Sequence, residues 1–385
     1  MSCGAVRCVH IFGAGRVPMT SLLQKPDWAE AKARLSAWWR HESLDRPVVE
    51  LTAPRATPLP GPEPVPPPVD PERAWLAFPA RLERAEADLR RTAFLGEAVP
   101  GVTPGLGPGS LGLFLGARGT FLDHTVWYHP CFDDIGTTHL QWDEANSHWQ
   151  WTLASTRLAL TRGTGRWVVE MPDLIENLDT LAALVGTLPL LEWLVTAPEE
   201  VHRLQRALVP LWFRAFDPLY ELIGPSEGGN AWLCFKAWAP GRMAKLQCDL
   251  SAMISPAMFE AFVWPYLAEQ AAGLDFVMYH LDGPDAVKHL ERVLAIPGLD
   301  VLQWTPGSGQ GHGGDPAYDF IYRAVLDAGK GVHATMPIEA VPAFVKRLGP
   351  SGLYISTTAP TEAEGRRLLA ELAQRPVPGG TARLD

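Results

Sequence analysis

The segment Phe276-Val277-Met278-Tyr279-His280-Leu281-Asp282-Gly283-Pro284 indicates most clearly which fold this chain adopts. Its first residues are apolar and β-prone, and they run into a polar turn that a helix start follows. Short apolar segments of this kind alternate with capped helix starts along most of the chain, which is typical of parallel β/α units. Eight segments have the strand pattern: 48–51, 167–171, 231–237, 245–250, 276–280, 301–304, 331–335 and 353–357. Because eight such strands can close a barrel, we predict a single (β/α)8 TIM barrel of the α/β class.

An extension precedes the barrel. We expect residues 1–45 to form an N-terminal extension with a helix, 46–375 the barrel, and 376–385 a tail. Pro26 and Asp27 begin an amphipathic helix whose apolar face carries Trp28, Leu35 and Trp38. The first eighteen residues contain no apolar run long enough for a signal peptide, and they are either an extension or a misassigned start.

Two further segments should lie outside the barrel. Residues 53–71 carry many prolines, which cannot donate hydrogen bonds to a sheet, and should form a proline-rich arm. Asp70 and Pro71 then begin a helix that we expect to be long and kinked at Pro79. Residues 120–152 hold histidines and aromatic residues without a helical or strand period, and should form an insertion at the barrel rim.

Composition limits the class of partner. The 385 residues are 47% hydrophobic and 20% charged, which indicates a folded globular chain rather than a disordered one. Lys plus Arg number 33 against 43 Asp plus Glu, and a net charge of −10 disfavours binding to nucleic acid or to an anionic membrane. We therefore expect small molecules or proteins as partners.

The cysteines and the apolar segments indicate a cytoplasmic protein without a membrane span. The five cysteines are scattered and form no C-x-x-C motif, which indicates neither a disulfide framework nor a structural zinc site. The richest apolar stretch, 178–195, is interrupted by Asp179, Pro189 and Glu192, and we expect it to form a buried pair of helices.

The candidate catalytic residues follow the predicted strands, because the active site of such a barrel lies at the carboxyl ends of its strands. His280 and Asp282 are two residues apart, so in an extended chain they project to the same side and could share a metal or a proton. Alternatively, Asp282 caps the next helix and His280 is a hydrogen-bonded core residue. Asp173 follows the strand at 167–171, where it is either catalytic or a helix cap. Gln303 completes the predicted catalytic set.

Other residues at the strand ends are candidates for substrate binding. Trp304 and Trp238 would wall the pocket, although Trp304 alone could equally be a packing residue. Asp249 and His333 follow or end their strands and would contact the substrate. Cys248, beside Asp249, is either a soft metal ligand or a buried inert thiol.

Three segments together resemble the uroporphyrinogen decarboxylase superfamily, and within it the branch of corrinoid-dependent methyltransferases. The segments are 247–259 (QCDLSAMISPAMF), 279–283 (YHLDG) and the closing strand 352–356 (GLYIS). The resemblance covers residues 160–375 well, and in the first 150 residues it extends only to the arrangement of the predicted elements. It implies a single barrel with its active cleft at the carboxyl face of the strands.

This chain departs from the superfamily in two ways. Members that methylate thiols bind zinc through a His-x-Cys motif and a later cysteine, whereas this chain reads His280-Leu281-Asp282 and has no cysteine after Cys248. The decarboxylases grip their substrate with N-terminal arginines, and only Arg55 follows the corresponding strand here. The resemblance therefore implies neither the thiolate zinc site nor the porphyrinogen substrate.

A weaker metal site is still possible on the residues present. His280, Asp282 and Cys248 offer three ligands and an open fourth position, and replacing thiolates by a hard carboxylate should weaken zinc binding. We expect at most one zinc per chain, or no tightly held metal.

Three functions agree with these residues. The first is a methyltransferase that works with a corrinoid protein or with a small methyl donor or acceptor. The second is a decarboxylase or lyase of a small carboxylated substrate, with Asp173 or Asp282 as proton donor beside His280. The third is a small-molecule binder that retains the fold without catalysis.

Overall fold

The computed structural model describes residues 20–42 and 44–374, which form a mixed α/β fold around a seven-stranded, mostly parallel sheet. The strand order is β2-β1-β13-β12-β11-β10-β9, and β2 alone runs antiparallel, against β1. The bounds are β1 Val48–Pro54, β2 Thr92–Gly96, β9 Met243–Gln247, β10 Phe276–Asp282, β11 Val301–Thr305, β12 Gly331–Thr335 and β13 Leu353–Thr358. Five of the eight predicted strands thus have a close counterpart among the parallel strands from β9 to β13.

The two faces of this sheet differ in polarity. Gln247, His280, Gln303 and His333 are paired in register across β9 to β12, so their side chains project to the same face. The next residues along the strands project to the other face, and there Leu281, Trp304 and Ala334 are buried and apolar. An open parallel sheet covered by helices is apolar on both faces. These four side chains, called the polar row below, therefore need a functional explanation.

Shorter strands continue the arrangement beyond the main sheet. β3 (Gly101–Val102) pairs in parallel with β6 (Val168–Val169), and Glu170 forms an isolated parallel bridge with Ala231. The predicted strand at 231–237 is instead a hairpin of β7 (Asn230–Trp232) and β8 (Ala237–Ala239), joined by the 3-10 turn η1 (Leu233–Phe235). The Asn230 side chain bonds both the N–H and the carbonyl of Met243, at 2.8 and 2.9 Å. The Asn230 amide thus connects the β7–β8 hairpin to the start of β9, although the hairpin and the seven-stranded sheet are separate sheets.

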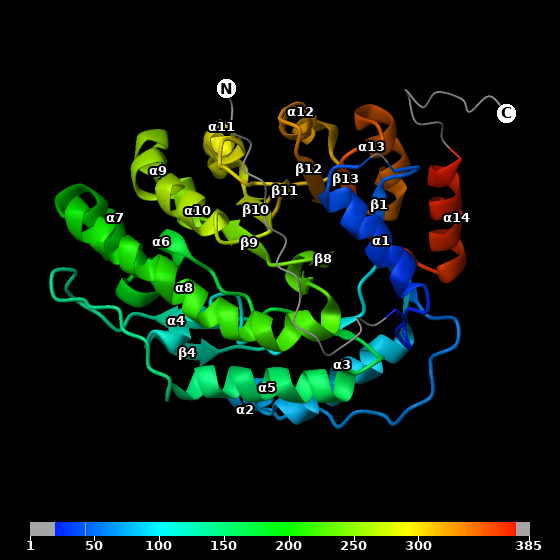
Figure 1. The fold of residues 1–385 in the computed structure, drawn as a ribbon, viewed down its shortest axis with the longest axis horizontal. Helices are drawn as coiled ribbons and strands as arrows, with labels where there is room; N and C mark the ends of the chain where they lie inside the picture. The colour runs from blue at the N-terminus through cyan, green and yellow to red at the C-terminus, as the bar shows by residue number, and fades with distance from the viewer. Residues whose placement is uncertain (1–19, 43, 375–385) are drawn as a thin grey trace.

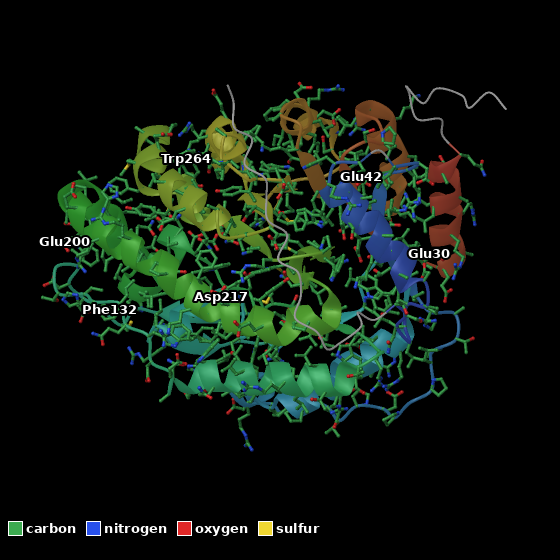
Figure 2. The ribbon with its side chains drawn as sticks, viewed as in Figure 1. Glu30, Glu42, Phe132, Glu200, Asp217 and Trp264 are labelled. Atoms are coloured by element: carbon green, nitrogen blue, oxygen red, sulfur yellow. The ribbon has the colours of Figure 1, made fainter. Side chains whose placement is uncertain are left out.

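Helices surround the strands, with α2, α3, α5 and α8 along one side of the molecule and α11, α12 and α13 along the opposite side (Figure 1). Long α8 can be followed from Glu200 to Asp217, whose carboxylate pairs with Arg242 before β9 (Figure 2). The helices described are α1 Trp28–Trp39, α2 Pro71–Leu76, α3 Phe78–Arg91, α4 Ser110–Phe114, α5 Ser147–Gly163, α6 Asn177–Val185, α7 Thr187–Thr196, α8 Pro198–Glu227, α9 Pro256–Phe262, α10 Trp264–Ala271, α11 Leu290–Leu294, α12 Asp319–Asp327, α13 Val341–Leu348 and α14 Glu362–Ala373.

Helix α1 packs against the amino-terminal ends of the strands. Its Trp39 ring lies 5.4 Å from Phe276, the first residue of β10, and its Trp38 ring lies 5.1 Å from Tyr354 near the start of β13. A Cβ atom on Gly331, the first residue of β12, would come within 2.9 Å of Trp38, so only glycine fits there. Since α1 covers this end, the carboxyl ends are left for a site.

The segments expected outside the barrel are more regular than predicted. Residues 55–70 contain neither helix nor strand, and the arm is held against α3 through the Leu59 N–H, which donates to the Arg90 carbonyl at 3.0 Å. The long kinked helix is two helices, α2 and α3, that separate at Ala77. The segment 120–152 contains most of an antiparallel hairpin, β4 (Arg118–Phe121) with β5 (Val126–His129), and the start of α5. The extension 1–18 and the tail 376–385 lie outside the described residues.

The apolar stretch at 178–195 forms two helices, α6 and α7, bent by 112° relative to each other. The expected burial holds for α6 but not for α7, whose Leu188 and Val195 are exposed. Within the described ranges, no single helix has the length and apolar character needed to cross a membrane, and only this bent pair meets the criteria jointly.

Candidate metal centre and adjoining cavity

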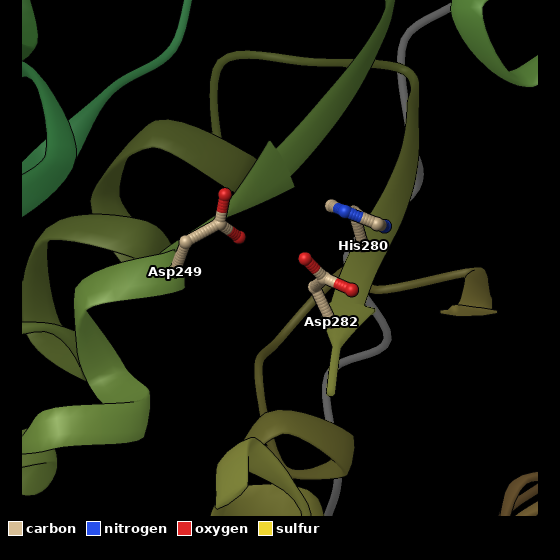
Figure 3. A group of neighbouring side chains, drawn as sticks. All are labelled: Asp249, His280 and Asp282. Atoms are coloured by element: carbon tan, nitrogen blue, oxygen red, sulfur yellow. The ribbon is translucent and has the colours of Figure 1, made fainter. Parts of the chain in front are cut away.

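Three side chains meet at the carboxyl ends of β9 and β10. Asp249 begins the 3-10 turn η2 (Asp249–Met253) just after β9, while His280 and Asp282 project from the polar face of β10. One ligand atom from each residue lies within 4.8 Å of the others, and Figure 3 shows the three side chains turned toward one another. In the part of the chain that the structure describes, they are the one group of His, Cys, Asp or Glu residues with this geometry.

A hydrogen bond to Gln303 determines the tautomer of His280, and burial determines its protonation state. The Gln303 Nε2 group donates to the Trp304 carbonyl and to Thr305 Oγ1, both at 3.0 Å, so Gln303 Oε1 faces Nδ1 of His280. Nδ1 must then carry the proton, and Nε2 is the ring nitrogen whose lone pair is available to a cation. Burial, with a smaller effect of the Lys245 charge, lowers the pKa of His280 to about 4. The imidazole is therefore neutral at physiological pH.

The two carboxylates of the group are electrostatically strained. Burial, followed by the charge of Asp179, raises the pKa of Asp249 to about 7, although solvent reaches the side chain. Burial also raises the pKa of Asp282, whose Oδ1 has no hydrogen-bond partner among the described residues. A neutral imidazole lone pair and two carboxyl groups thus converge, and Asp249 accepts a hydrogen bond from Gln247 Nε2 whereas Asp282 Oδ1 accepts none among the described residues. A divalent cation or a proton would relieve the repulsion.

The buried cation Lys245 lies beneath this group. Its Nζ is 2.9 Å from Asp173 Oδ1 and also donates to Gln247 Oε1, and the side chain is fully buried. Burial alone would lower the pKa of Lys245, but the charges of Asp173 and Glu176 raise it. Gln247 Nε2 in turn donates to Asp249 Oδ2 at 2.8 Å. A continuous polar chain therefore connects Asp173 to Asp249.

Glu176 and Asp179 place two further carboxyl groups next to the end of β9. Glu176 Oε1 accepts the backbone N–H of Gln247 at 2.5 Å, and Asp179 accepts the N–H groups of Asp249 and Leu250 at 2.7 and 2.8 Å. Burial raises the pKa of both carboxyl groups. The sequence analysis did not include Lys245, Glu176 or Asp179. A signal existed, because Asp173, Glu176 and Asp179 recur every three residues after a strand and Lys245 interrupts an apolar strand.

A cavity of about 260 Å³ lies at the Asp173 end of this polar chain, and none of its lining residues belongs to the metal group. Its lining includes Trp75, Arg81, Thr103, Glu170, Asp173, Trp232 and Cys234. Phe235, next to Cys234 in η1, contacts the His280 ring at a centroid distance of 4.7 Å, and Lys245 Nζ lies 5.9 Å from the Phe235 ring. Asp173 thus belongs both to the cavity and to the polar chain that leads to Asp249.

The predicted metal ligand Cys248 is not part of the group. Its side chain is buried in the hydrophobic core, and burial raises the pKa of the thiol well above its ordinary value. Neighbouring residues of an extended chain project to opposite sides, so Asp249 reaches His280 and Cys248 does not. Asp249, which was predicted to contact the substrate, joins His280 and Asp282, and Cys248 is the buried thiol that the sequence analysis gave as its alternative.

Trp304 and Trp238, which were predicted to line the pocket, face away from the site. Trp304 is buried on the apolar face of β11 and packs edge-on against Tyr318 at 5.3 Å, because it projects opposite to Gln303. Trp238 is buried against α1, with Lys32 Nζ 4.7 Å from its ring and Trp28 at 5.8 Å. Both tryptophans are packing residues, and Trp75 and Trp232 line the cavity instead.

The remaining candidates are placed as follows. His333 is buried in the polar row, its Nε2 is 3.1 Å from Ser356 Oγ, and burial lowers its pKa to about 3. Arg55 donates to the carbonyls of Gln24 and Thr92 in a separate groove of about 1130 Å³. The lining of that groove includes none of the metal-group residues and none of the residues that line the cavity at Asp173, so Arg55 lies away from both. Comparison with known proteins finds no matching family model and no matching curated protein.

Proposed function

We propose that this chain is a (β/α)8-barrel enzyme similar to the uroporphyrinogen decarboxylase superfamily, and that β1, β6, β7 and β9 to β13 are its eight parallel strands. The parallel β3–β6 pair, the Glu170–Ala231 bridge and the Asn230 contacts with Met243 support continuity between the short strands and the main sheet. The polar row from Gln247 to His333 supports a functional site on this face of the strands, since a face covered by helices would be apolar.

The reaction that we propose is cation-dependent methyl transfer, with a corrinoid protein or a small molecule as the other reactant. The convergence of His280, Asp249 and Asp282 carries this proposal. One nitrogen and two oxygen ligands suit Zn²⁺, Mn²⁺ or Fe²⁺ better than a soft thiolate-selective metal. Such a cation would act as a Lewis acid that lowers the pKa of a bound thiol or hydroxyl acceptor.

The residues of the chain would perform three tasks in this reaction. His280, kept neutral and oriented by Gln303, and the two carboxylates would hold the cation and leave a position open for the acceptor. Lys245 would keep Asp173 ionised and aligned beside the cavity. Decarboxylation receives less support, because Arg55, the one candidate for gripping substrate carboxylates, is bonded elsewhere.

We also propose that the enzyme acts in the cytoplasm, which agrees with the free thiols of Cys131, Cys234 and Cys248.

The test is methyl transfer from methylcob(III)alamin to 2-mercaptoethanol in the presence of each divalent cation. The thiolate sulfur would bond to the methyl carbon, the carbon–cobalt bond would break with both electrons left on cobalt, and cob(I)alamin would absorb differently. We expect transfer by the wild type and none by His280→Ala. Release of CO2 from small carboxylic acids without methyl transfer would favour the decarboxylase, and the absence of both reactions would contradict an enzymatic role.

A further inference from the structure

A groove of about 550 Å³, called the arm groove below, lies between the proline-rich arm and helix α3. This volume is within the range of ligand-binding pockets. Its walls come from the arm, from α2 and α3, and from the turn between β4 and β5, and none of its lining residues belongs to the metal group. The lining includes Pro67, Pro68, Trp75, Arg81, Arg84 and Asp123.

Arg84 reaches the arm groove without a partner. Its Nη1 atom is buried and has no hydrogen-bond partner, and within residues 20–42 and 44–374 its guanidinium group forms no ion pair. Partly buried charges are normally paired, because removing a charge from water is unfavourable. An unpaired guanidinium group in the wall of a groove therefore indicates a ligand that the chain itself does not supply.

A second guanidinium group lies close to the first. Arg81 is one helical turn before Arg84, and burial, followed by the Arg84 charge, lowers the pKa of Arg81 to about 10. The charge of Glu170 opposes this shift but is the smallest of the three causes. Arg81 donates to the carbonyls of Trp75 and Gly105, at 3.0 and 3.2 Å. Since these acceptors are neutral, the two arginines repel each other and their charges are not offset.

The acidic side chains of the arm groove do not neutralise this pair. Asp88 is exposed and pairs with Arg91 at 3.8 Å. Asp123 is exposed in the turn between β4 and β5, and among the described residues it forms no ion pair with either guanidinium group. Two guanidinium groups thus lie in a wall with one carboxylate that no other cation pairs with, and the groove has an excess of positive charge.

We propose that the arm groove binds a phosphate monoester, with the phosphate between Arg81 and Arg84 and the organic part against Trp75 and the prolines of the arm. A phosphate dianion can balance two guanidinium groups, and its oxygens match the N–H groups of arginine in charge and spacing. An indole and proline rings offer apolar surface to the rest of the ligand. The site is independent of the proposed methyl transfer, since it requires no cation at His280.

The probe is phenyl phosphate, titrated into the metal-free protein by calorimetry, with benzoate, benzyl alcohol and inorganic phosphate as comparisons. We expect phenyl phosphate to bind at least about tenfold more tightly than each of them, because it alone combines a dianion with an apolar ring. Equal binding of benzoate would show that a carboxylate suffices, and equal binding of benzyl alcohol that apolar contact selects the ligand. Equal binding of inorganic phosphate would show a site for the free ion. Each of these results would overturn the proposal.

Arginine modification locates the bound probe. Phenylglyoxal reacts with accessible guanidinium groups, and Arg84 lines the arm groove, whereas Arg157 is exposed on α5 and does not line it. Mass spectrometry should show that phenyl phosphate slows modification of Arg84 at least about fivefold and leaves Arg157 unchanged. Equal rates at Arg84 with and without a saturating probe would place the probe elsewhere and contradict the proposal.

Variants test the role of Arg84 directly. Arg84→Gln should weaken phenyl phosphate binding at least about tenfold, and Arg157→Gln, which changes the net charge equally, should not. Because Arg84 has no partner in the chain, Arg84→Gln should keep the melting temperature of the free protein. A clear fall in that temperature would show that Arg84 stabilises the fold and would overturn the proposal. His280→Ala should bind the probe as the wild type does, so a failure of methyl transfer would contradict the proposed function and leave the phosphate site standing.

Discussion

Nδ1 of His280 and Oε1 of Gln303 face each other across two neighbouring parallel strands, at positions paired in register. The amide is itself held by the Trp304 carbonyl and Thr305 Oγ1, so the histidine tautomer is set by a residue that does not belong to the metal group. Outer contacts of this kind typically change metal affinity 10- to 100-fold.

Gln303→Leu should therefore lower divalent-cation affinity by roughly 10- to 100-fold without unfolding the protein. Gln303→Glu, which keeps an oxygen acceptor for Nδ1, should retain most of the affinity. Calorimetric titration with Zn²⁺ measures both. Unchanged affinity in Gln303→Leu would show that the amide does not orient His280.

Cation affinity should depend on pH through Asp249 rather than through His280. The carboxyl of Asp249 has a pKa raised to about 7 and must lose its proton to bind a cation, whereas His280, with a pKa of about 4, is already neutral. Affinity should therefore fall about tenfold per pH unit below pH 7 and level off above about pH 8. In Asp249→Asn the remaining affinity should lose the part of this dependence that Asp249 contributes and keep that of Asp282, whose pKa is also raised. A midpoint near pH 4 in the wild type would assign the titrating proton to His280 instead.

Glu227 should make the protein less stable as the pH rises. This buried carboxyl accepts the Val169 N–H at 3.1 Å, and burial raises its pKa from 4.5 to about 8. Because the folded state favours the protonated form, the free energy of unfolding should fall as the pH rises from about 5 to 8. In Glu227→Gln the free energy of unfolding should decrease between about pH 5 and pH 8 by roughly 2 to 4 kcal/mol less than in the wild type. Urea unfolding at the two pH values measures this difference. Parallel pH profiles for wild type and variant would contradict this assignment.

Packing and site residues should respond differently to truncation. Leu302 is fully buried on β11, and Leu302→Ala should cost roughly 2 to 5 kcal/mol of stability through a core cavity. His280→Ala should abolish methyl transfer while keeping the melting temperature within a few degrees. Urea unfolding and circular dichroism distinguish the two effects, and a collapse of His280→Ala would indicate a packing role for His280.

Strand period and helix caps predicted much of the fold. The strands near 276–280, 301–304, 331–335 and 353–357 form β10 to β13, because their apolar residues and flanking turns are local signals. The segment 231–237 was predicted wrongly, since a hairpin with Lys236 at a positive φ of 52° interrupts it. A single apolar run does not reveal such a turn, as Lys is not a typical turn residue.

The site was only partly predictable for a related reason. His280 and Asp282 could be placed together because they share one strand face. The choice between Cys248 and Asp249 depends on which of two adjacent residues projects toward His280, and the sequence does not show the orientation where β9 ends. Glu176 and Asp179 approach Gln247 and Asp249 from a distant segment, and their three-residue spacing after a strand does not show which strand they contact.

The most direct test of the account is zinc titration of four proteins: wild type, Cys248→Ser, Asp249→Asn and His280→Ala. We predict one zinc per chain in wild type and in Cys248→Ser with equal affinity, and a loss of at least about tenfold in Asp249→Asn and His280→Ala. Loss of zinc in Cys248→Ser with retention in Asp249→Asn would contradict the ligand set, and zinc bound equally by all four proteins would contradict the metal centre altogether.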